Sequence, residues 1–253
     1  MRKLLYVTLF AALLVACGKD TFQNIDTAGQ SGSITRFAIY NNYMYVLNLN
    51  EVQTYNLGQD NKPVLFHTLA TDYGLETIQV YDGSIYVGST TALYILDITR
   101  PGAPTLLSKT DPDAFDFVER CDPVVIKNNY VYSTLKVIQN SCGTISANSA
   151  LVVYDITDKV APFVVSEILM NIPNGLGYNE THLFVCDEGV DQVVVFDLEN
   201  PGNPTPTNFN ISITDPVDLI INGKTMIVST KTDFQIYDIS DVANIKRTAL
   251  ITK

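Results

Sequence analysis

Short apolar segments alternate with polar turns along residues 33–253. The segments Leu93–Asp97 and Leu151–Asp155 are typical, because each is rich in β-branched and aromatic residues and ends at turn-forming residues. Segments of this length and composition are characteristic of strands and are too short for helices. The pattern therefore predicts an all-β protein built from many short strands.

These strands belong to a sequence repeat. Near-copies of Leu151–Asp155 recur along the chain, and their acidic or amide markers are separated by 41, 58, 42 and 41 residues. A period near 40 residues indicates a repeat architecture. We expect each marker side chain to accept a hydrogen bond from the backbone N–H two residues on and so to open a turn, not to act in catalysis. The five markers are Asn56, Asp97, Asp155, Asp197 and Asp238.

A hairpin is predicted before each of these segments. Its turns are mostly Asn-Asn, Asp-Gly or Asn-Gly pairs, which tolerate positive φ, and each is followed by another apolar segment. Each repeat then holds four short strands, so five repeats predict a five-bladed β-propeller of four-stranded antiparallel blades. A β-solenoid and a two-sheet sandwich remain alternatives, because periodicity does not show that a ring closes. The turns are Asn41-Asn42, Asp82-Gly83, Asn128-Asn129, Asn179-Glu180 and Asn222-Gly223.

Two of the copies carry a family resemblance. Leu93-Tyr-Ile-Leu-Asp-Ile98 and Leu151-Val-Val-Tyr-Asp-Ile156, each followed by a proline-containing turn, resemble the LVIVD repeats of bacterial cell-surface propeller proteins. The resemblance covers roughly residues 33–253 and implies a propeller fold and a cell-surface location. It implies no chemistry for any particular residue.

The N-terminus predicts export and lipid anchoring. Arg2 and Lys3 precede an apolar segment, and Leu14-Val-Ala-Cys17 is similar to the lipobox of bacterial lipoproteins. We expect residues 1–16 to be a signal peptide, Cys17 to be lipidated and polar residues 17–32 to be a flexible tether. Gly18 after the cysteine favours the outer membrane, facing either the periplasm or the cell exterior. The alternative is an ordinary cleaved signal with an incidental cysteine.

Charge narrows the choice of partners. The chain has a formal net charge of −11, and loss of residues 1–16 removes only Arg2 and Lys3, which moves it to −13. Such an excess of negative charge argues against nucleic acid and anionic lipid head groups. Cations, cationic proteins and neutral glycans remain. Residues 33–253 are enough for a single core, so we expect one propeller domain.

The third repeat is longer than the others and contains a predicted disulfide. Its insertion includes Cys142, and Cys121 lies where its first strand should begin. The start of the first strand and the loop between the second and third lie at the same end of a four-stranded meander, so the two thiols can approach. In an exported, oxidised protein we expect Cys121 and Cys142 to pair, which leaves Cys186 as a free thiol.

Candidate ligand-binding residues gather at one end of the predicted blades. The connections between blades, and the loops between second and third strands, vary in length and sequence, and they all meet at that end. Variable loops on a rigid scaffold are where binding usually occurs. The candidates are Arg36, Glu76, Asp116, Asp122, Asp187, Glu188 and Asp218.

Three functions are compatible with these residues. The first is a non-catalytic module that binds a protein or a glycan, with no cofactor. The second is a calcium site, because hard cations prefer clustered oxygen ligands. The third is a glycoside hydrolase, which needs two facing carboxylates such as Asp122 with Asp218 or Asp116 with Asp187. The binding module is the expectation and catalysis is not, because no nucleophile, phosphate-binding or zinc motif is present in the sequence.

Overall fold

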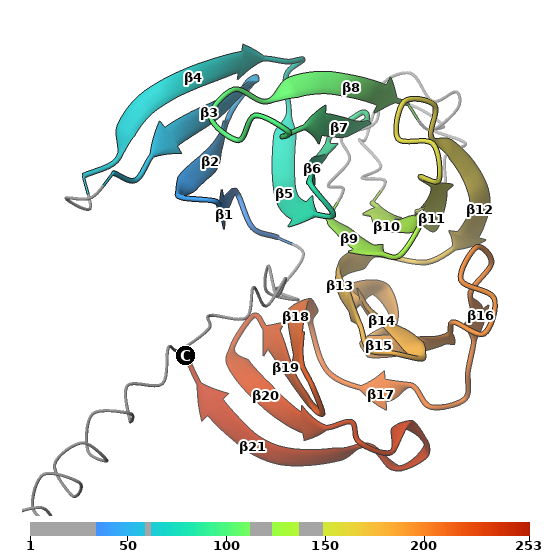
Figure 1. Cartoon of the computed structure of the whole chain (residues 1–253). Coiled ribbons are helices and arrows are strands. Elements are labelled where there is room, and N and C mark those ends of the chain that lie inside the picture. The colour runs from blue at the N-terminus through green and yellow to red at the C-terminus, as the bar shows by residue number, and fades with distance from the viewer. Residues whose placement is uncertain (1–33, 59–61, 112–122, 137–148) are drawn as a thin grey trace, which may run out of the picture.

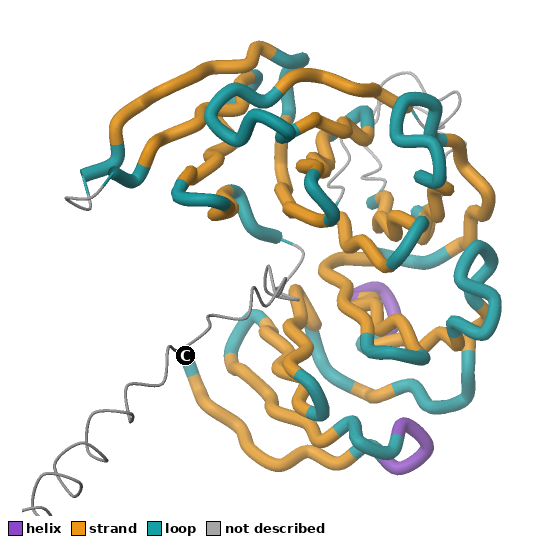
Figure 2. The backbone as a smooth tube through the Cα atoms, in the orientation of Figure 1, coloured by secondary structure: helices purple, strands orange, loops and turns teal. Residues whose placement is uncertain are grey.

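Strands are the main secondary structure in the part of the chain that the structure describes (Figure 2). A computed structural model describes residues 34–58, 62–111, 123–136 and 149–253. The strands form five sheets set side by side along an arc, with β1, β5, β9, β13 and β18 on the inside (Figure 1). Within the described residues no helix is long and apolar enough to cross a membrane.

Each sheet is made of strands that are consecutive in the chain and antiparallel. The first sheet holds β1 (Phe37–Tyr40), β2 (Tyr43–Asn48), β3 (Glu51–Asn56) and β4 (Val64–Ala70). The second holds β5 (Leu75–Tyr81), β6 (Ser84–Ser89), β7 (Leu93–Asp97) and β8 (Thr105–Thr110). The third holds β9 (Val124–Lys127), β10 (Tyr130–Leu135), β11 (Ala150–Asp155) and β12 (Phe163–Leu169). The predicted four-stranded antiparallel units are confirmed in these sheets.

The last two sheets follow the same plan with one variation. The fourth holds β13 (Pro173–Tyr178), β14 (His182–Asp187) and β15 (Gln192–Asp197), and its outer strand is split into β16 (Thr205–Pro206) and β17 (Ile211–Ser212), both paired with β15. The fifth holds β18 (Pro216–Asn222), β19 (Thr225–Thr230), β20 (Asp233–Asp238) and β21 (Lys246–Thr252). Two short 3-10 helices, η2 (Glu188–Val190) and η3 (Val242–Asn244), lie in loops of these sheets.

The repeat markers act as turn formers, as predicted. Each marker ends the third strand of its sheet, and its side-chain oxygen accepts a hydrogen bond from the backbone N–H two residues later, at 2.6–2.9 Å. The hairpin turns also agree with their residue types, since Asn41, Asn42, Asp82 and Gly83 all have positive φ. The turn at Asn179 is stabilised differently, because the Asn179 side-chain oxygen accepts hydrogen bonds from the backbone N–H groups of Thr181 and His182.

Cores form between neighbouring sheets. Tyr86, from the centre of the second sheet, packs with Val124, Ile126 and Val131 of the third. Tyr132 of the third sheet packs in the same way on the fourth, and Phe184 of the fourth packs on the fifth. Because alternate residues of a strand point to opposite faces, each inner sheet buries both faces against its neighbours. The sheets therefore form one continuous body.

Of the four cysteines, the structure describes one. Cys186 in β14 is a free thiol with its side chain fully buried, and burial raises its pKa. The predicted lipidation site Cys17 and the predicted disulfide partners Cys121 and Cys142 lie outside the described residues.

Candidate functional site

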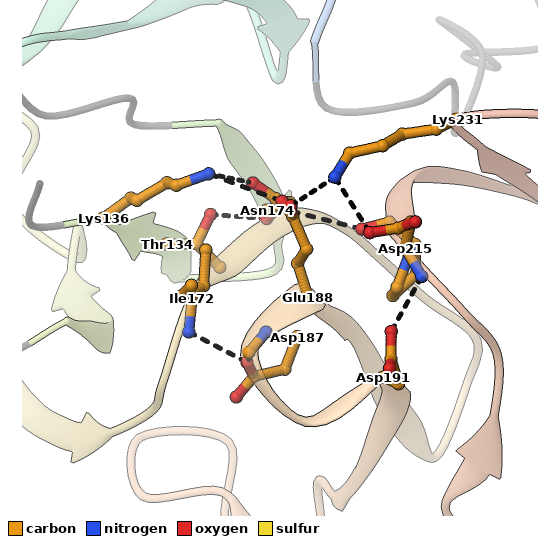
Figure 3. A network of polar contacts seen from close by, with 11 residues as sticks. Thr134, Lys136, Ile172, Asn174, Asp187, Glu188, Asp191, Asp215 and Lys231 are labelled. Atoms are coloured by element: carbon orange, nitrogen blue, oxygen red, sulfur yellow. Dashed lines mark hydrogen bonds and ion pairs between the residues drawn. The ribbon is translucent and has the colours of Figure 1, made fainter.

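The connections between sheets, and the loops between second and third strands, lie at the same end of every sheet and therefore on one side of the arc. We call this end the loop rim; it includes residues 71–74, 90–92, 136, 188–191, 213–215 and 231–232. A polar network spans the rim across the third, fourth and fifth sheets (Figure 3). It contains two of the predicted candidates, Asp187 and Glu188.

Asp187 shapes the loop that carries the network. It is the last residue of β14, is 2% exposed, and caps η2 by accepting a hydrogen bond from the Gly189 backbone at 3.1 Å. The same carboxylate accepts from the backbone N–H groups of Asn171 at 3.0 Å and Ile172 at 2.9 Å. A carboxylate at the start of a helical turn is well placed for such bonds. In this structure Asp187 therefore holds two loops together and sets the direction of Glu188.

Glu188 is the centre of the network. Its carboxylate lies 2.7 Å from Lys231 Nζ and 3.6 Å from Lys136 Nζ, and it accepts a hydrogen bond from Asn174 Nδ2 at 3.1 Å. Hydrogen bonds from Lys231 and then Asn174 hold the pKa of Glu188 below its ordinary value. The side chain is 23% exposed, so it is partly accessible from the rim.

Lys231 carries the network to the fifth sheet. Its ammonium group also lies 2.8 Å from the Asp215 carboxylate, and its hydrogen bonds to Asp215 and then Glu188 raise the Lys231 pKa. Asp215 has a φ of 48°, and its backbone N–H donates to Asp191 Oδ1 at 2.9 Å. Two lysines thus face the carboxylates of Glu188 and Asp215, whereas the carboxylates of Asp187 and Asp191 bind backbone N–H groups.

Asn174 joins the three sheets. It lies near the start of β13, where its amide donates to Glu188 and to the Pro216 carbonyl and accepts from Lys136 Nζ at 3.2 Å. Its backbone carbonyl accepts from Thr134 Oγ1 at 2.6 Å. These bonds fix the relative positions of β10, β13 and β18 at the rim.

The network arises directly from the repeat. Lys136, Glu188 and Lys231 occupy the same repeat position, the first residue after the second strand, in three successive sheets. Asn174 likewise occupies in β13 the position that Glu76 occupies in β5. Lys136, Asn174 and Lys231 are not among the candidates predicted from the sequence, most of which are acidic. Alignment of the repeats could have found them.

A second, smaller ion-pair group lies on the same rim. Lys109 Nζ lies 3.0 Å from Asp72 and 3.3 Å from Asp111, and the Tyr94 hydroxyl donates to Asp72 at 2.9 Å. Hydrogen bonds from Lys109 and then Tyr94 lower the pKa of Asp72. Tyr73, beside it, is 72% exposed. An accessible aromatic ring therefore lies next to an ordered charged group.

The remaining predicted residues are spread over the arc. Arg36 lies before β1 and donates from Nη2 to the Leu75 carbonyl at 3.1 Å, beside Glu76 in β5. Asp218 lies in β18, tight against Gly175 of β13. The structure brings Asp187 and Glu188 together and leaves Arg36 and Glu76 in the first two sheets. Asp116 and Asp122 lie outside the described residues.

The electrostatics of Glu188 differ from those expected of the general acid of a glycosidase. A general acid of a glycosidase has a raised pKa, whereas the pKa of Glu188 is lowered by its lysine and amide partners. Within the part of the chain that the structure describes, no group of three or more His, Cys, Asp or Glu residues could hold a metal ion. The network instead offers ordered donors and acceptors at a partly accessible surface.

Comparison with solved structures identifies the architecture. A candidate 6-phosphogluconolactonase from Bacteroides uniformis matches with a TM-score of 0.66 and 12% identity, over 85% of this chain and 70% of that one. A protein from Lactobacillus plantarum matches with a TM-score of 0.63 and 15% identity, over 83% of this chain and 68% of that one. A chain of a nidogen/laminin complex matches with a TM-score of 0.56 and 13% identity, over 84% and 76%.

These likenesses define the class of fold. Together with the five blade-like sheets, they show that the chain has a β-propeller-like fold. At identities this low they carry no information on function. No protein-family model matches the chain, and a search of curated proteins found no match either.

Proposed function

We propose that this protein is a lipid-anchored, five-bladed β-propeller of the LVIVD-repeat kind that acts as a non-catalytic binding module at the outer membrane. The lipobox-like segment ending at Cys17 supports the anchor. The loop rim supports the binding role, because its loops are held by a rigid arc of sheets.

One observation carries the binding role. Three equivalent loop positions, Lys136, Glu188 and Lys231, converge from three sheets into one partly exposed set of donors and acceptors. A set that is already ordered binds a ligand with a smaller loss of side-chain entropy. Because Glu188, Asp215 and Lys231 are already paired with one another, the set suits the hydroxyl and amide groups of a glycan or of a protein surface better than a strongly charged ligand.

An array screen tests the binding role. The full chain, purified in detergent, is applied to arrays of glycans and of bacterial surface proteins, and the same ligands are assayed for cleavage. We expect saturable binding to a defined ligand class without turnover. Absence of binding on both arrays would contradict the binding role, and turnover of a bound glycan would replace it with a hydrolase.

Metabolic labelling tests the anchor separately. Cells expressing the protein are grown with radiolabelled palmitate, and the protein is then recovered from membrane and soluble fractions. We expect the label and the membrane association to be present in the natural chain and lost in Cys17→Ala. A chain that stays in the membrane without label after this substitution would contradict lipid anchoring.

A further inference from the structure

The first repeat carries an exposed leucine where later repeats carry the charged network. Leu49 is the first residue after β2, the repeat position that Glu188 and Lys231 occupy in the fourth and fifth sheets. Its side chain is 56% exposed. Leu49 also has a φ of 50°, a conformation that is strained for leucine and that glycine or asparagine adopts more readily. Exposure and backbone strain together indicate a role beyond closing the hairpin.

A second large side chain is exposed on the adjoining loop of the rim. Tyr73, between β4 and β5, is 72% exposed, the highest fraction among the large apolar and aromatic side chains that the structure describes. Backbone hydrogen bonds join its loop to the loop of Leu49. The Thr71 N–H donates to the Asn50 carbonyl at 2.8 Å, and the Gly74 N–H donates to the Leu49 carbonyl at 3.1 Å. Leu49 and Tyr73 therefore belong to one exposed surface, which we call the Tyr73 patch.

The loop that carries Tyr73 is fixed on both sides of the ring. Gly74 has a φ of 93°, and a Cβ atom there would lie 2.2 Å from Thr90 Oγ1, so a larger residue would be strained and crowded. The Gly74 carbonyl accepts from the Thr90 N–H at 2.9 Å. On the other side of the ring, the Asp72 carboxylate lies 3.0 Å from Lys109 Nζ. An aromatic ring on an ordered loop loses little entropy when it binds a partner.

The polar part of the patch has a surplus of negative charge. Lys109 pairs with both Asp72 and Asp111, at 3.0 and 3.3 Å, so two carboxylates share one ammonium group. The two aspartate side chains are 63% and 61% exposed, whereas the lysine is 34% exposed. The outer part of this group is therefore negative. The face of a tyrosine ring also attracts cations, so the carboxylates and the ring favour the same kind of ligand group, an ammonium or a guanidinium.

We propose that the Tyr73 patch binds a protein partner through a segment that carries an apolar side chain next to an arginine or a lysine. This inference rests on the proposed binding role and names the partner as a protein. The apolar side chain packs on Leu49 and Tyr73, and the cationic side chain binds the carboxylates of Asp72 and Asp111. Tyrosine and arginine are enriched among the residues that dominate the affinity of protein interfaces.

Leu49 favours a protein over a glycan at this patch. Sugar hydroxyls covered by a leucine side chain lose water without gaining hydrogen bonds, which costs free energy. An apolar side chain of a protein gains from the same contact in proportion to the area that it buries. The formal net charge of the chain, −11, also steers a basic partner toward the molecule.

A peptide array probed with the full chain in detergent tests the partner class. Its peptides have equal length and contain phenylalanine with arginine, phenylalanine with glutamate, or serine with arginine. We expect selective retention of the phenylalanine–arginine peptides, weakened about tenfold or more in Tyr73→Ala. Phe163→Ala is the matched control and should retain them unchanged. Phe163 is 58% exposed, and it pairs with Asp155 at the end of β12 that lies away from the rim.

Leu49→Asn separates binding from folding. Asparagine tolerates positive φ, so the melting temperature should stay the same or rise, while retention of the phenylalanine–arginine peptides falls several-fold. A leucine with a purely structural role gives the reverse result, a lower melting temperature with unchanged retention, and this result would overturn the proposal.

The other outcomes distinguish this inference from the binding role itself. Failure to retain the phenylalanine–arginine peptides, or equal retention of all three peptide classes, overturns the inference, and binding to the glycan or surface-protein arrays then still supports the binding role. Retention of a glycan that is lost in Tyr73→Ala also overturns the inference, because the patch would then be a sugar site. Absence of binding to peptides, glycans and surface proteins alike overturns both.

Discussion

Single hydroxyl groups tie neighbouring sheets together. Tyr45, with its side chain fully buried, donates to the Pro101 carbonyl of the next sheet at 2.8 Å. Tyr86 occupies the same repeat position in the second sheet, but the turn it faces contains Lys159-Val160 in place of Pro-Gly. Its hydroxyl is buried, and although Ser84 lies near it, it makes no hydrogen bond of ordinary geometry among the described residues. We therefore expect the tyrosine hydroxyl to stabilise the folded state in the first sheet and not in the second.

This difference predicts opposite outcomes for one substitution. Tyr45→Phe removes a hydrogen bond and leaves the Pro101 carbonyl without its donor, so it should destabilise the protein by about 1 kcal/mol. Tyr86→Phe removes a buried hydroxyl that makes no hydrogen bond of ordinary geometry in the described structure, so its effect should be about zero or stabilising. Urea unfolding of both variants measures the two values. A larger loss for Tyr86→Phe than for Tyr45→Phe would contradict the contacts.

The lowered pKa of Glu188 predicts a pH dependence. A carboxyl whose pKa is lower in the folded than in the unfolded state stabilises the fold above its unfolded pKa, and this contribution is lost as pH falls through the folded value. Glu188→Gln should therefore lower the melting temperature at neutral pH, and the difference from the natural chain should shrink in acid. Thermal melts between neutral and acidic pH measure it. Glu199→Gln, an exposed change at the opposite end of the sheets, is the control and should show no such convergence.

At the scale of the elements, the inner strands β13 and β18 approach each other closely at Gly175. A Cβ atom on Gly175 would lie 1.9 Å from Asp218 Oδ1 and 2.6 Å from Asp218 Cα, so the backbone of β18 would have to move. On Gly177, two residues further along β13, the closest atom would be Leu219 Cδ1 at 2.6 Å, the end of a flexible side chain. Position 175 therefore requires glycine, because the backbones of β13 and β18 lie too close there for a side chain.

The two glycines give a matched test of this approach. Gly175→Ala should destabilise the fold by about 1–3 kcal/mol, because overpacking here displaces backbone. Gly177→Ala should cost clearly less, since Leu219 can change its rotamer. Chemical unfolding of the two variants gives both values, and equal costs would contradict the close contact of β13 with β18.

The sequence predicted most of the strand arrangement, and particular residues show why. Asp97 and Asp155 signal their turns through local hydrogen bonds, so their role could be read from spacing alone. Lys136 and Lys231 could not be read that way, because a lysine in a loop is ordinarily solvated. Their role depends on three loops meeting around Glu188, which is a tertiary property. Asp187 is the opposite case. The sequence predicts a ligand-binding residue there, but its carboxylate accepts three hydrogen bonds from backbone N–H groups and so stabilises the loop.

The excess of negative charge on the whole molecule raises the question of whether the protein binds calcium. An acidic rim could bind calcium, although the described carboxylates Glu188, Asp215 and Asp72 are paired with lysines. We expect the melting temperature to be the same in calcium chloride and in chelator. A saturable rise with calcium would contradict this and would indicate a site, because a ligand that binds only the folded state raises its stability.

For the whole molecule, we propose that the loop rim, and not the opposite end of the sheets, is the binding surface. The most direct test compares the affinity of the array ligand for the natural chain, Lys231→Ala and Lys62→Ala. Lys231 belongs to the rim network, whereas Lys62 is exposed in a turn at the opposite end of the sheets. Each variant removes one positive charge, so the two differ only in where the charge is lost. We predict that Lys231→Ala weakens binding by about tenfold or more, in keeping with the loss of a central polar contact, and that Lys62→Ala leaves it unchanged. Equal weakening by both variants, or none by Lys231→Ala, would contradict the central claim.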